Sequence, residues 1–382
     1  MSDNNLRSYF LLDPKVAFLN HGSFGACPKP VFERFQEWQL ELERQPVEFL
    51  GRRSDGLMDE ARAALGEYVN ASANDLIFVP NATAGINIVA RSLDLKAGDE
   101  ILSNDHEYGA LDFTWGFVCS KTGAKYVQHS IPLPVTSHED FVESLWEKVT
   151  PRTRVIYMSH VFSPTALITP VAEICRRARE SGIWTVIDGA HAPGHIPVDL
   201  QAIGPDFYSG NCHKWMSAPK GTAFLYANPD FQNLLAPLIV SWGFDDPTWA
   251  GRNLWQGTRE VSAFLSVPAA INFMHEHDWD SVRRECHALA KATRQRIIDL
   301  TGLPAIAPDD AGWFNQMFTA RLPKVDEEVL KARLYDEYLV EVPLVKRFEE
   351  NFIRVSIQGY NTREDVDRLL NALSKLLPQL AQ

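Results

Sequence analysis

Short apolar segments alternate with helix-length segments along most of the chain, from about residue 54 to residue 226. The helix-length segments repeat apolar residues three and four positions apart, and the short segments are rich in β-branched and aromatic residues. We expect helices at residues 59–69, 85–92 and 171–181. The predicted strands are residues 76–79, 100–103, 125–128, 155–160, 184–188, 207–209 and 222–226. This alternation favours an α/β fold with a mostly parallel sheet that helices cover on both faces.

The last third of the chain follows a different pattern. Helices are expected at residues 261–274, 281–300 and 363–380, and strands at residues 314–321 and 352–357. Helices and strands without regular alternation are typical of a smaller α+β domain. We therefore predict an N-terminal segment at residues 1–20 that packs on the small domain, a large domain at residues 21–265, and a small C-terminal domain at residues 266–382.

Composition and charge narrow the class of protein. The chain has 382 residues, 45% hydrophobic and 23% charged, which is ordinary for two or three globular domains. Its net charge of −12 repels nucleic-acid backbones, and no apolar run is long enough to cross a bilayer. The five cysteines have no paired spacing, and the first residues do not form a secretion signal. We expect a cytoplasmic protein with reduced thiols and neither a nucleic-acid nor a membrane partner.

Two segments carry groups for chemistry on a ring cofactor. Trp184-Thr-Val-Ile-Asp-Gly-Ala-His191 is an apolar strand that ends in a carboxylate, and ligand sites in open α/β sheets lie beyond such strand ends. Asp188 could face a cationic ring nitrogen there, or it could simply cap the turn. Lys214 follows the next predicted strand among aromatic residues, in Tyr208-Ser-Gly-Asn-Cys-His-Lys-Trp215. Burial would make it the neutral amine that Schiff-base chemistry needs, although most lysines lie on the surface.

Other segments could bind anions. In Val79-Pro-Asn-Ala-Thr-Ala-Gly-Ile86 a strand runs into a helix, whose free amide groups, with the Thr83 hydroxyl, suit a phosphate group. Helix capping by Asn81 or Thr83 explains the same residues. Arg354 interrupts an apolar strand, where its guanidinium could hold a carboxylate or face solvent. Thr258, after Gly257, is a weaker phosphate candidate.

Several other chemistries lack their motifs. The zinc-protease motif HExxH, the serine-hydrolase motif GxSxG, and the Walker and dinucleotide-binding loops are absent. His275 and His277 suit a solvated helix end better than a metal site. We therefore expect no metal.

Taken in order, five segments resemble the class V aminotransferase family of fold-type I, pyridoxal-phosphate-dependent enzymes. They are Asn81-Ala-Thr-Ala-Gly85, Asp188-Gly-Ala-His191, His213-Lys214, Gly257-Thr258 and Arg354. The resemblance covers nearly the whole chain. Three more segments are similar to the isopenicillin N epimerase-like branch of that family: Asn20-His-Gly-Ser-Phe-Gly25, Arg52-Arg-Ser-Asp55 and Asp105-His-Glu-Tyr-Gly109. The resemblance implies pyridoxal 5′-phosphate bound by the large domain, an amino-acid-type substrate and a homodimer.

The family pattern also implies roles for the matched residues. Lys214 would form the Schiff base with the cofactor and move the α-proton, and Asp188 would pair with the pyridinium nitrogen, which keeps the ring an electron sink. Arg354 would hold the substrate carboxylate, with His21 and Arg53 as further substrate-side residues. The other implied cofactor contacts are the Ala82 backbone, Thr83 and His213 at the phosphate, Thr258 at a phosphate across a dimer interface, His191 and Ser163 at the ring hydroxyl, and Tyr108 stacked on the ring, with His106 as its alternative.

The same residues serve several reactions. Epimerisation returns the proton to the opposite face, so Lys214 needs a second acid–base group or must reach both faces. A carbon–sulfur lyase acting on a cysteine conjugate or sulfoxide, and an aminotransferase, are the alternatives; the matched branch favours the epimerase. A cysteine desulfurase needs a loop cysteine shortly before the C-terminal Arg, and residues 301–382 contain no cysteine. A non-catalytic protein of this fold would have lost Lys214 or Asp188, and both are present.

Overall fold

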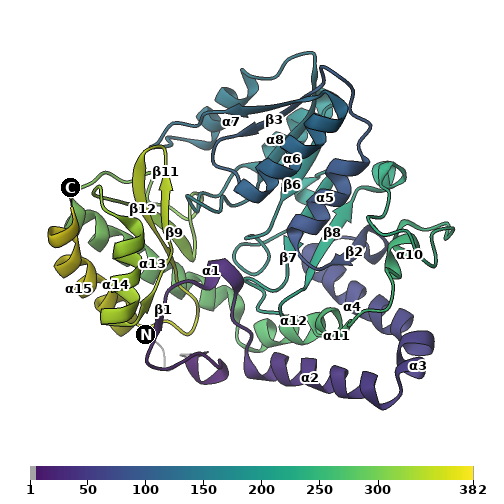
Figure 1. Cartoon of the computed structure of the whole chain (residues 1–382), viewed down its shortest axis with the longest axis horizontal. Coiled ribbons are helices and arrows are strands. Elements are labelled where there is room, and N and C mark those ends of the chain that lie inside the picture. The colour runs from purple at the N-terminus through teal and green to yellow at the C-terminus, as the bar shows by residue number, and fades with distance from the viewer. Residues whose placement is uncertain (1–5, 382) are drawn as a thin grey trace.

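A seven-stranded sheet forms the centre of the larger part of the molecule (Figure 1). The computed structural model describes residues 6–381. The sheet has the order β2-β8-β7-β6-β5-β3-β4, in which β8 is antiparallel to both neighbours and the other pairs are parallel. Its strands are β2 (Leu76–Val79), β3 (Glu100–Asn104), β4 (Lys125–His129), β5 (Thr153–Ser159), β6 (Trp184–Asp188), β7 (Phe207–Asn211) and β8 (Ala223–Ala227). The predicted α/β class with a mostly parallel sheet is confirmed.

Both faces of the sheet are buried away from β4, which explains why strands such as β2 and β5 are mostly apolar, whereas β4 is partly exposed. Consecutive residues of β5 join different cores: Ile156 packs in the core that contains α8 (Val171–Glu180), and Val155 packs in the core that contains α5 (Ala82–Ser92) and α6 (Gly109–Thr122). Because parallel strands need crossover helices, these helices cover the two faces. The helices leave the carboxyl ends of the parallel strands uncovered, and the loops at these strand ends can form a site.

The C-terminal part is built on a second sheet. β11 (Leu344–Arg347), β12 (Glu350–Ser356) and β9 (Met317–Leu322) form an antiparallel sheet in that order. The helices of this part are α13 (Trp279–Thr301), α14 (Glu327–Tyr338) and α15 (Arg363–Leu380). The smaller α+β part is thus confirmed as an antiparallel sheet with helices.

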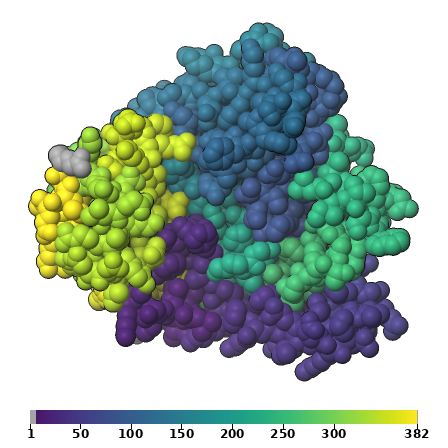
Figure 2. All heavy atoms as spheres, viewed as in Figure 1, coloured from purple at the N-terminus to yellow at the C-terminus, as the bar shows by residue number. Residues whose placement is uncertain are grey.

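The N-terminal segment lies between the two parts, as Figure 2 shows for this face. β1 (Ala17–Phe18) pairs in parallel with β10 (Val340–Glu341), and the Leu6 amide donates to the Gly359 carbonyl at 3.1 Å. Residues 1–5 of the segment expected on the small domain lie outside the described residues. Both contacts join the described part of this segment to elements of the C-terminal part.

The expected helix at residues 261–274 is two helices, α11 (Ser262–Leu265) and α12 (Val267–Glu276). A proline in its first turn begins α12, as is common at a helix start. α12 packs against α4 (Ser54–Val69) and α2 (Lys29–Arg44), so the chain still contacts helices of the large part just beyond residue 265.

The remaining helices are short, apart from α7. They are η1 (Leu6–Tyr9), α1 (His21–Phe24), α3 (Pro46–Glu48), η2 (Phe49–Arg53), η3 (Ala73–Asp75), α7 (His138–Trp146), α9 (Leu200–Ile203), η4 (Pro229–Leu234) and α10 (Trp249–Leu254). Within residues 6–381, none of the helices combines the length and the apolar character needed to cross a membrane.

Candidate active site

A cavity of about 420 Å³ lies at the carboxyl ends of β5, β6 and β7. Arg354 of the small sheet and residues of α1 complete its wall. Nine of the twelve residues predicted for the site line this one cavity: Ala82, Thr83, Tyr108, Ser163, Asp188, His191, His213, Lys214 and Arg354. Segments far apart in the sequence therefore meet at the sheet edge where parallel strands place their ligands.

Lys214 is held as an amine that loses its proton easily. Its Nζ lies 3.0 Å from His191 Nε2, and Trp215 Nε1, which can only donate, lies 3.4 Å from His191 Nδ1. His191 Nδ1 therefore accepts, and its Nε2–H donates to the lone pair of the Lys214 amine. Burial and the nearby positive charge of Arg354 lower the pKa of Lys214 to about 7. Such an amine is a nucleophile and a base near neutral pH.

Asp188 lies at the end of β6, beside this amine. Burial raises the pKa of Asp188 to about 6, against the opposing effects of the Ala190 amide, which donates to Oδ1 at 2.8 Å, and of the Lys214 charge. The carboxyl group is still mostly ionised at neutral pH. A cationic ring nitrogen in the cavity would pair with the Asp188 carboxylate and would lower the pKa of this group.

The first turn of α5 offers an anion site. The Ala82 amide donates to Asn211 Oδ1 and the Ala84 amide to the capping Asn81 Oδ1, both at 2.8 Å. Among the described residues, the Thr83 amide has no partner, and its side chain lines the cavity. A helix start with one free amide and an adjacent hydroxyl suits a phosphate group. Two residues of this turn were predicted to bind the phosphate. Thr83 is available for it, whereas the Ala82 amide is hydrogen-bonded to Asn211.

His213 faces the same end of the cavity. Its Nδ1 donates to the Thr222 carbonyl at 2.8 Å, which directs Nε2 away from that carbonyl. Burial lowers the pKa of His213 to about 4, so the ring is neutral.

Arg354 is a buried cation without a carboxylate partner in the part of the chain that is described. One terminal nitrogen donates to the Ser163 carbonyl at 2.6 Å and to Ser163 Oγ at 3.1 Å, and the other donates to Ser23 Oγ at 3.0 Å. Its Nε is buried without a partner. A guanidinium held in this way is ready for a carboxylate ligand, since an unpaired buried charge is costly. Ser163, expected at the ring hydroxyl, lines the cavity and accepts hydrogen bonds from Arg354.

Tyr108, and not His106, lines the cavity. His106 is fully buried, with Nδ1 3.1 Å from Thr165 Oγ1 and Nε2 3.0 Å from the Ile131 carbonyl. Tyr108 caps α6 and is 45% exposed. Of these two candidates, the structure therefore leaves Tyr108 available to a ring in the cavity.

Three predicted residues do not line the cavity. His21 is buried behind it, where its Nε2 lies 3.0 Å from the Lys214 carbonyl and its Nδ1 3.0 Å from the Tyr360 hydroxyl. Arg53 pairs with Glu41 at 2.9 Å. Thr258 lies in the loop after α10. None of the three lies in the wall of this cavity within the described chain.

Sequence reasoning missed residues that orient the site. Ser23 and Asn211 line the cavity and hydrogen-bond to Arg354 and to the start of α5, respectively. Glu107 is fully buried and accepts hydrogen bonds from the Ser159 amide and hydroxyl and from Asn104 Nδ2. Asn211 could have been found, because it ends the strand before Lys214. Ser23 contacts a residue 331 positions away, which no local pattern reveals.

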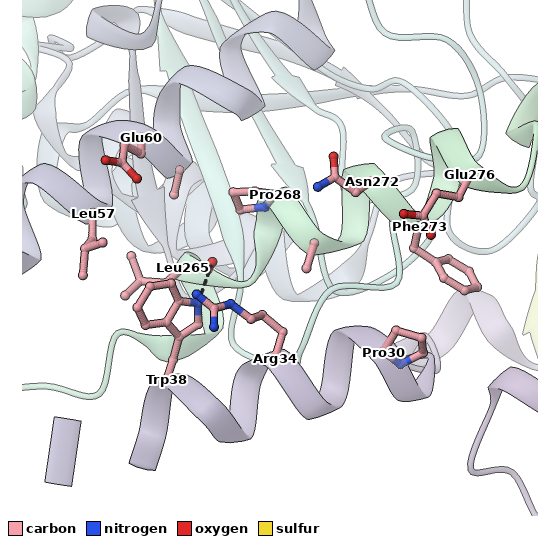
Figure 3. A pocket seen from close by; sticks show the side chains of 12 residues that line it. Pro30, Arg34, Trp38, Leu57, Glu60, Leu265, Pro268, Asn272, Phe273 and Glu276 are labelled. Carbon is pink, nitrogen blue, oxygen red and sulfur yellow. Dashed lines mark hydrogen bonds between the residues drawn. The ribbon is translucent and has the colours of Figure 1, made fainter. Parts of the chain in front are cut away.

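A second hollow of about 420 Å³ lies between α2, α4 and α12 (Figure 3). Trp38 forms part of its wall and donates to the Leu265 carbonyl at 3.1 Å, and Arg34 lies over the Trp38 ring. Arg34 is also paired with Glu37 at 2.8 Å. None of the residues predicted for chemistry lines this hollow, so the cavity at the sheet edge is the candidate active site.

Comparison with known proteins shows the family of the chain. The family model "Aminotransferase class-V" matches residues 26–369. The chain is 37% identical to isopenicillin N epimerase of Amycolatopsis lactamdurans, over 97% of this chain and 98% of that protein. It is 27% identical to a probable L-cysteine desulfhydrase, chloroplastic, of Arabidopsis thaliana, over 96% of this chain and 84% of that protein.

A solved structure shares the fold. The enzyme C-DES, in a mutant with glycine covalently linked to the pyridoxal-phosphate cofactor, superposes with a TM-score of 0.86 at 20% identity, over 97% of this chain and 99% of that one. The expected cofactor, pyridoxal 5′-phosphate, is therefore supported by both the family and the fold. The chain belongs to the class V aminotransferase family of pyridoxal-phosphate-dependent enzymes.

Proposed function

We propose that this enzyme is an epimerase or racemase that inverts the α-carbon of an amino-acid substrate. One observation carries the proposal: a single cavity holds a neutral lysine amine, a carboxylate for a cationic ring and a buried guanidinium without a carboxylate partner in the described chain. The lysine suits Schiff-base chemistry, the carboxylate suits the ring nitrogen of the cofactor, and the guanidinium suits the carboxylate of a bound amino acid. The 37% identity to an isopenicillin N epimerase over nearly the whole chain favours inversion.

The cavity fits pyridoxal phosphate on its own chemistry. The free Thr83 amide and hydroxyl, with His213 nearby, suit the phosphate, and Asp188 suits the ring nitrogen. His191, whose Nε2 lies 3.0 Å from Lys214 Nζ in the cavity wall, would serve the ring hydroxyl. Pyridoxal phosphate, when bound, supplies an electron sink for the bonds at the α-carbon of an attached amino acid.

The chain's own residues then control the substrate. Arg354 binds the carboxylate through the terminal nitrogens that Ser163 and Ser23 orient. Lys214, neutral near pH 7, accepts the α-proton at Nζ, and the His191 contact keeps this amine directed into the cavity. Fixing the carboxylate and the base at once sets which bond at the α-carbon is aligned for cleavage.

A carbon–sulfur lyase is the alternative, because a probable L-cysteine desulfhydrase is also related. A desulfurase mechanism lacks its cysteine: the segment before Arg354 forms β10 and β11 and contains none. An aminotransferase remains open on the same cavity. Fold and cofactor alone do not choose among these reactions.

Proton NMR in D₂O separates them. The purified holoenzyme is incubated with isopenicillin N, L-alanine, S-methyl-L-cysteine and its sulfoxide. Inversion predicts loss of the α-proton signal and formation of the other stereoisomer, without a keto acid. Pyruvate from the cysteine derivatives would instead make the enzyme a lyase and contradict the proposal.

We further propose that the enzyme is a cytoplasmic homodimer. Large apolar side chains remain exposed on α6 and on residues 234–244, among them Phe113 and Trp242, each 82% exposed. Residues 234–244 contact the end of α5, where Ser92 Oγ accepts from the Ala236 amide at 3.0 Å, and α5 packs against α6. Gathered apolar surface of this kind marks interfaces. The five free cysteines suit a reducing compartment.

A further inference from the structure

Inversion requires a proton on the face of the α-carbon opposite the one that loses it. Lys214 is restrained on its own side. His21 and the backbone of Gly25 hold its main chain, and a Cβ added at Gly25 would lie 2.8 Å from the Lys214 carbonyl oxygen. His191 holds its amine at 3.0 Å. A lysine fixed at both ends is poorly placed to serve both faces.

The strand order puts another side chain across the cavity from Lys214. Lys214 follows β7, Asp188 ends β6, and Tyr108 follows β3, with β5 between β6 and β3. All three line the cavity. Lys214 and Tyr108 therefore enter it from opposite sides of Asp188, which would pair with the cofactor ring.

Apart from Thr83, whose hydroxyl we assign to the phosphate, the other proton-carrying groups of the cavity are already engaged. His191 contacts Lys214 and Trp215, and His213 contacts the Thr222 carbonyl. Ser23 and Ser163 bind Arg354, and the Ser159 hydroxyl donates to Glu107. The Tyr108 hydroxyl has no hydrogen-bond partner within the described chain.

Tyr108 is also held firmly at its base. The Oε1 atom of Glu107 accepts from the Ser159 amide at 2.9 Å and from Asn104 Nδ2 at 2.6 Å, which joins the ends of β5 and β3. The Tyr108 main chain is thus fixed, while its partly exposed ring can exchange protons with solvent.

We propose that Tyr108 is the second acid–base catalyst, which donates its hydroxyl proton to the α-carbon on the face opposite Lys214. This role rests on the proposed inversion. The α C–H bond gives its proton to Lys214 Nζ, and the bonding pair, held by the electron sink, forms a new C–H bond with the Tyr108 proton. A protonated Lys214 and a phenolate remain, and proton exchange with solvent restores both. In the reverse direction the two residues exchange roles.

Tyr108→Phe tests the role because it keeps the ring and removes the proton. With the stereoisomer pair that wild type interconverts in D₂O, we expect inversion to fall at least 100-fold. Deuterium exchange at the α-carbon should persist for the stereoisomer whose proton Lys214 removes, with retention of configuration. Cofactor affinity of the apoprotein, measured by tryptophan fluorescence, should stay within twofold. Tyr335→Phe on α14, 44% exposed, is the matched control and should leave all three values unchanged.

Other outcomes overturn the proposal in distinguishable ways. Inversion by Tyr108→Phe at the wild-type rate removes Tyr108 from the chemistry and leaves the epimerase intact. Equal losses of exchange, inversion and cofactor affinity mean that Tyr108 is structural. A wild-type enzyme that forms pyruvate, or no inverted product, overturns both the epimerase and the role of Tyr108.

Discussion

The chemistry of this protein depends on single side chains whose burial sets their charge. Lys214 is half-buried and Arg354 is buried, both are cationic in their ordinary states, and the Arg354 charge destabilises the charge of the Lys214 amine. The Lys214 amine is the group that loses its proton, because the Arg354 guanidinium stays protonated even where burial lowers its pKa to about 10. The result is a neutral base beside a permanent cation, which suits an amino acid.

The pH dependence of cofactor attachment follows from this. Only the neutral amine reacts, and the pKa of Lys214 is lowered to about 7. The rate at which the apoprotein binds pyridoxal phosphate, followed by stopped-flow absorbance, should be low at pH 5.5, rise through a midpoint near pH 7 and become constant above it. Arg354→Gln removes a positive neighbour and should move the midpoint to higher pH. A wild-type midpoint near the ordinary lysine value would contradict the assignment.

Arg354 should act on the substrate more than on the cofactor. Arg354→Gln removes a buried charged clamp, which costs about 2–5 kcal/mol of amino-acid binding by analogy with interface charge pairs. Titration of the holoenzyme with a non-reacting amino-acid analogue measures this, and cofactor titration of the apoprotein is the comparison. Similar losses in both titrations would assign Arg354 a structural role.

At the scale of elements, the backbone of α1 and its following turn shapes the Lys214 loop. Gly25 has a φ of +71°, and a Cβ there would lie 2.1 Å from the His213 carbonyl oxygen. Only glycine allows this contact without moving the loop.

Gly25→Ala should therefore lower both stability and cofactor affinity. Gly98→Ala is a matched control, because its φ is +91° but no atom lies within 4 Å of the added Cβ. The control should cost about 1–2 kcal/mol from the left-handed conformation alone. Thermal unfolding and cofactor titration measure both effects, and identical results for the two variants would show that the close approach is unimportant.

Pattern predicted some elements well because their burial is regular. The predicted and observed bounds of β6 and α15 are the same, at residues 184–188 and 363–380. The sequence pattern does not predict α6, because apolar residues of this helix lie on its inner and its outer side. Leu111 and Trp115 are buried, whereas Phe113 is exposed. A helix without a polar face gives no clear periodicity. A partner subunit that covered the outer face of α6 would explain why this face is apolar.

The site was predictable in its residues and not in its contacts. Motifs of a few residues placed Asp188, Lys214 and Thr83 beside strand ends, and the sheet then brings such ends together. The link from Arg354 to Ser163 and Ser23 spans 191 and 331 positions, and tertiary packing alone creates it. The burial of His21 likewise depends on Tyr360, at the far end of the chain.

At the scale of the whole molecule, the exposed apolar surface on α6 and residues 234–244 predicts a dimer. Sedimentation velocity at micromolar concentration should give twice the chain mass. Phe113→Asp places a charge on this surface and should shift the protein to monomer, whereas Val329→Asp, on α14 away from it, should not. A wild-type monomer at every concentration would contradict the dimer.

The proposed chemistry at the α-carbon depends on one covalent attachment, between the cofactor and Lys214. Borohydride reduction of the holoenzyme, followed by peptide mass spectrometry, tests it directly. We predict that the cofactor is found on the peptide that contains Lys214, and that Lys214→Ala yields no labelled peptide and no turnover. Label on Lys220 or another lysine, or turnover by Lys214→Ala, would contradict the account.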